Sequence, residues 1–90
     1  MTVYLVDRTL PGITIEQLAA AQGAAIATTE QFRAEGRDVR YLRSIFVPGD
    51  AHCMCLFEAP NAEVVKAIND TAQIPYNAVL EALDMPPQTA

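Results

Sequence analysis

Both cysteines and the single histidine of this 90-residue chain lie in one short stretch, "FVPGDAHCMCLFEA", at residues 46–59. Thiolate, imidazole and carboxylate groups bind transition metals, and a pair of thiols can also take part in redox chemistry. The stretch therefore admits three interpretations: a metal site, a redox pair, or a β-strand with side chains of these types. The choice depends on which side chains share a surface.

Cys53 and Cys55 are separated by one residue in a segment with strand character. Side chains two apart in a strand share a face, with Cβ atoms about 6.6 Å apart, whereas a disulfide needs about 3.8 Å. We therefore expect no disulfide between them. A structural zinc site needs four ligands, and His52 is expected on the opposite face. The two cysteines are predicted to be free thiols in the core, because free cysteine is among the most buried residue types.

The elements that position these residues follow from local signals. Thr14 and Gln17 match a helix capping box, and Gly36 is a natural helix terminator. Asn61 can begin a second helix, which Pro75 ends. The predicted strands are residues 3–8, 39–47, 52–59 and a last one within 76–83.

The order β-α-β-β-α-β predicts an α+β protein of the ferredoxin-like kind, with a four-stranded antiparallel sheet and two helices on one face. We expect residues 1–85 to form a single domain and residues 86–90 a flexible tail. A chain of this length buries a modest share of its surface and gains much from a partner. The open sheet face must then be covered by a partner, which makes a homodimer the expectation, or used for a ligand.

The register of the predicted hairpin decides which side chains lie on the open face. We place Gly49 and Asp50 at the centre of a tight turn, so that Val47 pairs with His52 and Tyr41 with Glu58. Alternation then assigns these side chains to the open face: Tyr41, Arg43, Ile45, Val47, His52, Met54, Leu56 and Glu58. It assigns these to the helix-covered face: Leu42, Ser44, Phe46, Cys53, Cys55 and Phe57.

Three functions remain open from this pattern. The first is a small dimeric protein that binds a divalent transition metal, with the donors Tyr4, Tyr41, His52 and Glu58 on the open face or at the dimer interface. The second is a cofactor-free protein or enzyme that binds a small metabolite in a pocket formed by Arg43, Tyr41 and Glu58. The third is an interaction module whose open face serves only to dimerise.

Other classes of protein are excluded by composition and motifs. The net charge is −5 and the six Lys and Arg residues are scattered, which argues against nucleic-acid binding. The sequence contains no phosphate-binding loop, dinucleotide fingerprint or zinc-finger spacing, so no organic cofactor is expected. No catalytic triad can be assembled from one histidine. The sequence has no signal peptide and no apolar stretch of about 18 residues, so we expect a cytoplasmic protein that does not contact a membrane.

Three stretches carry a resemblance to a known family: "YLVDRTLPGIT", "VRYLRSIFVPGD" and "CMCLFEAP". With them the chain resembles a family of small actinobacterial proteins, classed as a domain of unknown function, one branch of which is described as nickel-binding. The resemblance extends from Val3 to about Asp84. It implies a ferredoxin-like fold, a homodimer and, for that branch, nickel binding.

Overall fold

The computed structural model describes residues 1–87 and has the predicted order of elements. The elements are β1 (Thr2–Thr9), α1 (Ile15–Ala34), β2 (Arg40–Val47), β3 (His52–Ala59), α2 (Ala62–Thr71) and β4 (Ala78–Ala82). The strands form one antiparallel sheet in the order β2-β3-β1-β4. The ferredoxin-like α+β fold is thus confirmed, while the last three residues of the predicted tail, 88–90, lie outside the described residues.

Both helices begin at the predicted caps and α1 ends just before Gly36, whereas α2 ends at Thr71, four residues before the predicted end at Pro75. The Gln17 backbone N–H donates to Thr14 Oγ1 at 3.1 Å, and the Thr14 N–H donates to Gln17 Oε1 at 3.0 Å. Asn61 caps α2 by accepting from the Val64 N–H at 3.1 Å. After α1, Gly36 has a φ of 90°, a value that glycine adopts at little cost. These bonds join residues three positions apart and mark where each helix starts.

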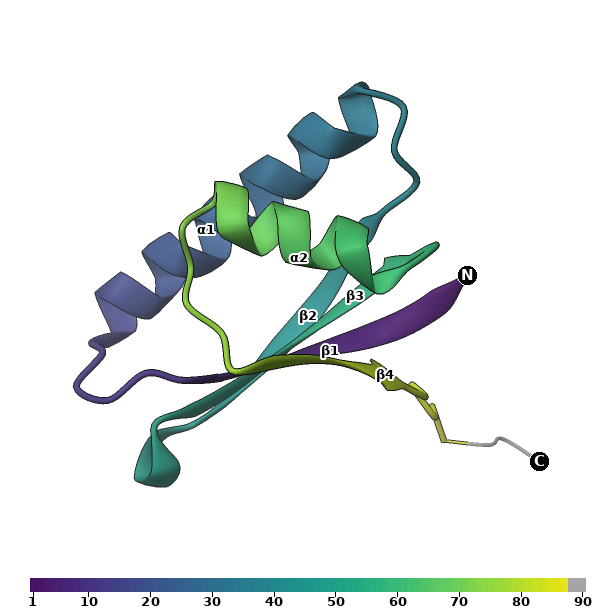
Figure 1. Ribbon diagram of the computed structural model, residues 1–90. Coiled ribbons are helices and arrows are strands. Elements are labelled where there is room, and N and C mark those ends of the chain that lie inside the picture. Colours follow the sequence, from purple (N-terminus) through teal and green to yellow (C-terminus); the bar gives the residue numbers. More distant parts are fainter. Residues whose placement is uncertain (88–90) are drawn as a thin grey trace.

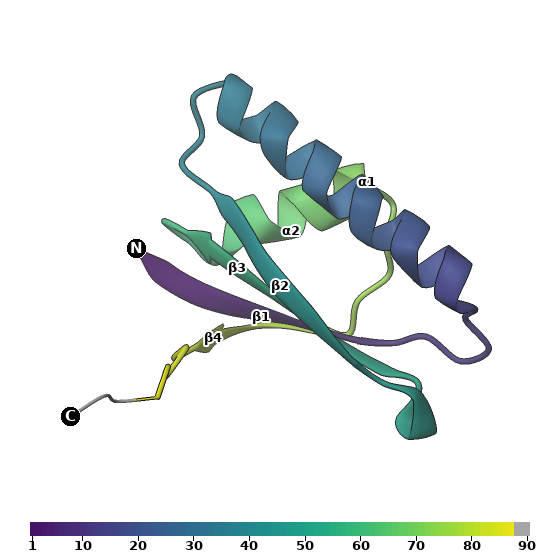
Figure 2. The same cartoon turned by 180° about the vertical axis from the view of Figure 1, so that it is seen from behind.

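Both helices lie over one face of the sheet, and the other face is uncovered (Figure 1). The view from behind shows the same two layers, with α1 running alongside β2 (Figure 2). The core fills the space between the layers and includes Val6, Phe57, Val65 and Ile68, all fully buried. The alternation of buried and exposed positions along β1 and β3 therefore separates a helix-covered face from an open face.

A β-bulge in β2 corrects part of the predicted register. Val47 pairs with His52, Ile45 with Met54 and Arg43 with Leu56, as predicted. The predicted pairing of Tyr41 with Glu58 is wrong, because the register shifts between Tyr41 and Arg43. Leu42 is the extra residue, so Tyr41 lies opposite Phe57 on the helix-covered face and Arg40 lies opposite Glu58. Leu42 itself, predicted for the covered face, is only partly buried.

The hairpin turn also differs in detail from the prediction. Residues Pro48–Asp50 form a single 3-10 turn, and Ala51 follows with a left-handed φ of 51°. The Ala51 N–H donates to the Pro48 carbonyl at 3.2 Å. The turn is therefore longer than the predicted two-residue turn. The ladder still begins at Val47 and His52, which is why the faces near the turn are as predicted.

Candidate functional site

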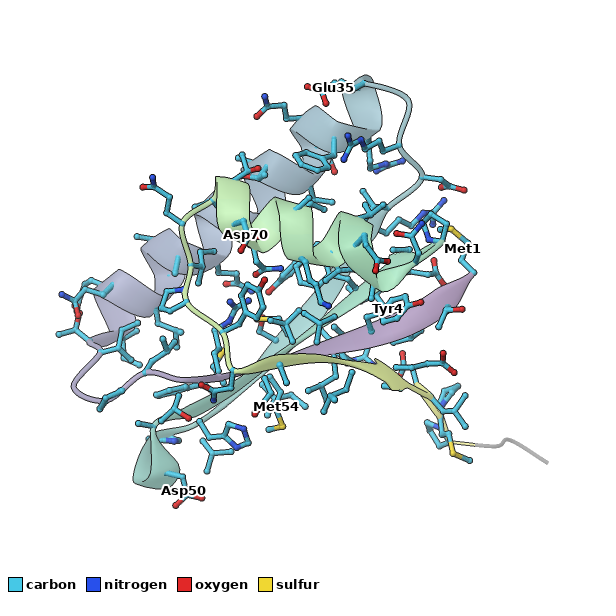
Figure 3. All side chains as sticks on the ribbon, in the orientation of Figure 1. Met1, Tyr4, Glu35, Asp50, Met54 and Asp70 are labelled. Atoms are coloured by element: carbon cyan, nitrogen blue, oxygen red, sulfur yellow. The ribbon has the colours of Figure 1, made fainter. Side chains whose placement is uncertain are left out.

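The four predicted metal donors do not come together in one chain. Tyr4 is buried and, like Tyr41, lies opposite Phe57 on the helix-covered face. Figure 3 shows Tyr4 on the helix side of the sheet and Met54 on the opposite side. His52 and Glu58 share the open face but stand at opposite ends of β3, about 20 Å apart at the usual rise of a strand. Of the four, only these two can act on the open face.

The open face instead brings His52 next to an acid that the sequence analysis did not single out. Asp7 Oδ1 contacts His52 Nε2, and both side chains are partly exposed. The hydrogen bond from His52 holds the pKa of Asp7 below its ordinary value, against a smaller effect of desolvation. In the register, His52 lies opposite Thr9 and Asp7 opposite Met54, so the two are diagonal neighbours.

The sequence carried part of the signal for Asp7. Val3, Leu5 and Asp7 alternate along the first predicted strand and must share one face. The missing information was the pairing of that strand with the third one. In the structure β1 lies between β3 and β4, and this central position places Asp7 beside His52. The backbone N–H of Asn77 also donates to the Asp7 carbonyl at 2.7 Å, which ties the segment before β4 to β1.

The predicted pocket of Arg43, Tyr41 and Glu58 is not assembled. Tyr41 lies on the helix-covered face, where its ring meets Phe57 edge to face at 5.3 Å. Arg43 is on the open face but bonds Asp84 Oδ1 at 2.6 Å, with about half of its side chain exposed. Its guanidinium is therefore already paired with a carboxylate from the segment after β4.

An apolar surface covers the middle of the open face. One row across the sheet holds Leu80, Leu5 and Leu56, and the next row holds Met54 and Ile45. We call these five side chains the open-face patch. Ile45 and Leu80 are each more than half exposed, at 52% and 53%. Asp7 stands in the second row beside Met54, so the Asp7–His52 pair borders the patch.

A cavity of about 130 Å³ lies on the other side of the sheet, beneath α1. Cys53 and Cys55 line it together with Arg8, Gln22, Ser44 and apolar side chains. Both cysteines are buried free thiols, as predicted. Burial raises the pKa of the Cys53 thiol to about 11. The Asp7–His52 pair and the Cys53–Cys55 pair are therefore on opposite faces of the sheet.

Within residues 1–87, no three side chains among His, Cys, Asp and Glu converge on one point where a metal could bind. One chain therefore offers possible metal ligands in pairs, Asp7 with His52 and Cys53 with Cys55. No helix in that range is long and apolar enough to cross a membrane.

Comparison with known proteins gives the family. The family described as "Nickel responsive protein SCO4226-like" matches residues 4–82. The chain belongs to the SCO4226-like family. The resemblance seen in the sequence is thereby confirmed, and the family is described as nickel responsive.

Among solved structures, the SCO4226-like chain is similar to the crystal structure of SCO4226 from Streptomyces coelicolor A3(2). The identity is 24% and the TM-score 0.76, with 98% of this chain and 99% of that chain covered. At this identity the likeness establishes the shared fold. No curated protein matches the chain.

Proposed function

We propose that this protein binds Ni²⁺ through the Asp7–His52 pair and works as a homodimer that covers the open-face patch. The observation that carries the proposal is the contact between His52 Nε2 and Asp7 Oδ1 on the open face. Imidazole and carboxylate are both suitable ligands for Ni²⁺. The family's description as nickel responsive supports this choice of metal.

The two donors are already directed at each other. A metal ion would take the place of the proton between them, with the imidazole binding through Nε2 and the carboxylate through Oδ1. Their partial exposure leaves the remaining coordination positions accessible to water or to a second subunit. The Ni²⁺ would therefore bind between the ends of β1 and β3.

The dimer is proposed from the patch beside the pair. Apolar side chains at the centre of an open sheet face are typical of a subunit contact. In a two-fold dimer each surface meets its own copy, so a donor pair near the axis is doubled. Two chains would supply four protein ligands where one supplies two.

Native mass spectrometry of tag-free protein, with and without added Ni²⁺, Zn²⁺ or Cu²⁺, tests both parts. We expect a dimer that retains nickel at a fixed stoichiometry. His52→Ala and Asp7→Asn should each abolish retention. Glu58→Gln is the matched control, because it removes a carboxylate from the same face at the other end of β3. Nickel retention by the His52→Ala protein, or nickel loss from the Glu58→Gln protein, would show that the site is not at Asp7 and His52.

The same experiment also bears on the interaction module. A dimer that holds no metal would favour an interaction module built on the open-face patch. The metabolite pocket near Arg43 has less support, because Asp84 occupies the guanidinium that was expected to hold an acidic ligand.

A further inference from the structure

A second donor pair lies inside the molecule, away from Asp7 and His52. The sulfur atoms of Cys53 and Cys55 are 3.8 Å apart on the helix-covered face of β3. A metal–thiolate bond is about 2.3 Å long, as measured for zinc. Because 3.8 Å is less than twice that length, one ion can bond both sulfurs without separating them.

A buried positive charge stands beside these thiols. Arg8 lies opposite Cys53 in the β1–β3 ladder, lines the same cavity and is 2% exposed. Its guanidinium donates to Asn69 Oδ1 at 2.9 Å and to the Pro75 carbonyl at 3.2 Å, both neutral oxygens. None of the ion pairs formed within residues 1–87 involves Arg8. Burying a cation without an anion costs free energy, so a negative charge next to Arg8 would be stabilised.

We propose that Cys53 and Cys55 bind one monovalent soft metal ion, Cu⁺, with Arg8 as the counter-charge. Thiolates are the protein ligands that select Cu⁺. Each thiol loses its proton to solvent as its sulfur bonds the metal, so the two thiolates and Cu⁺ together carry one negative charge. That charge balances the guanidinium. A divalent ion with the same two thiolates would form a neutral complex. The positive charge of Arg8 would then have no counter-charge.

The surroundings of the sulfurs favour a thiolate complex. Ser44 Oγ donates to Cys55 Sγ at 2.9 Å, a hydrogen bond that a bound thiolate can keep. The cavity of about 130 Å³ borders both sulfurs and leaves room for the ion. Gln22 lines this cavity and is also exposed, so the cavity reaches the surface at α1. We therefore expect an ion to enter at this point.

The test is an anaerobic titration of reduced, tag-free protein with Cu⁺ in competition with a chromogenic Cu⁺ chelator. We expect one Cu⁺ per chain in the wild-type protein. Cys53→Ala and Cys55→Ala should each lose this binding, whereas His52→Ala and Asp7→Asn should retain it. The proposal would be overturned if both cysteine variants bound Cu⁺ as the wild-type protein does, or if His52→Ala lost Cu⁺ binding.

X-ray absorption of the Cu⁺-loaded wild-type protein gives a second measurement that does not depend on the folding of any variant. Two sulfur ligands and no imidazole are expected, and a first shell of nitrogen or oxygen would contradict the site. Nickel retention is measured separately on the same proteins. Cys53→Ala should keep nickel, so failure of one metal site leaves the test of the other intact.

Discussion

Asp7 and His52 form a side-chain contact that links β1 to β3 at the border of the open-face patch. Each residue comes from a different strand, and neither has another acid or imidazole of its own strand beside it on that face. The contact has consequences for stability as well as for metal binding.

The first prediction concerns acid stability. The pKa of Asp7 is lower in the folded chain than its ordinary value, so near that value the unfolded chain binds more protons and stability rises with pH. This contribution is fully present above the ordinary carboxyl pKa and is lost as the pH falls through the lower, folded pKa. Asp7→Asn should remove it.

Urea denaturation of wild-type and Asp7→Asn protein between pH 6 and about pH 3 measures the effect. Because the pair is partly exposed, the difference should be at most about 1 kcal/mol. Glu58→Gln serves as the control. A parallel pH dependence in wild-type and Asp7→Asn protein would show that the contact contributes nothing.

The second prediction concerns the helix-covered face. Phe57 is fully buried and packs edge to face against Tyr41. Phe57→Ala should lower the free energy of unfolding by about 3–5 kcal/mol, since it leaves a cavity under the helices. Lys66→Ala, at an exposed position of α2, should change it by less than about 0.5 kcal/mol. Equal midpoints for the two variants in chemical denaturation would mean that the core is misassigned.

The third prediction concerns the proposed dimer. Ile45→Asp and Leu80→Asp place charges at the two exposed ends of the open-face patch. Each should convert the dimer to monomer, because an interface would have to desolvate the new carboxylate. Light scattering coupled to size exclusion measures the mass. Ala27→Asp, on the exposed side of α1, should leave the mass unchanged. A dimer that survives both patch variants would place the contact elsewhere.

The fourth prediction concerns the bonds of Arg8. Asn69 is fully buried, accepts from Arg8 and donates to the Val65 carbonyl at 2.8 Å. Leucine is similar in size to asparagine, but Asn69→Leu leaves the buried Arg8 guanidinium without one acceptor. This should lower the free energy of unfolding by about 1.5–3 kcal/mol. Asn69→Asp keeps an acceptor and adds a counter-charge, so it should lose less stability at neutral pH. If thermal melts rank the two variants in the opposite order, Arg8 does not need this acceptor.

Local signals in the sequence determined the elements of this protein. The capping box at Thr14 and Gln17, the cap at Asn61 and the alternation of β3 each involve residues a few positions apart. Their hydrogen bonds and exposures depend on near neighbours, so a pattern along the chain is enough to predict them. The order of these elements was sufficient for the fold, and the burial of both cysteines followed from it.

Only the tertiary structure decided which chemical groups meet. The bulge at Leu42 moved Tyr41 away from Glu58 and placed its ring against Phe57, and no turn signal in the sequence marks it. The central position of β1 placed Asp7 beside His52 on one face and Arg8 beside Cys53 on the other. These contacts join residues 45 positions apart, and such pairings are fixed by the packing of the whole sheet, which no local pattern encodes.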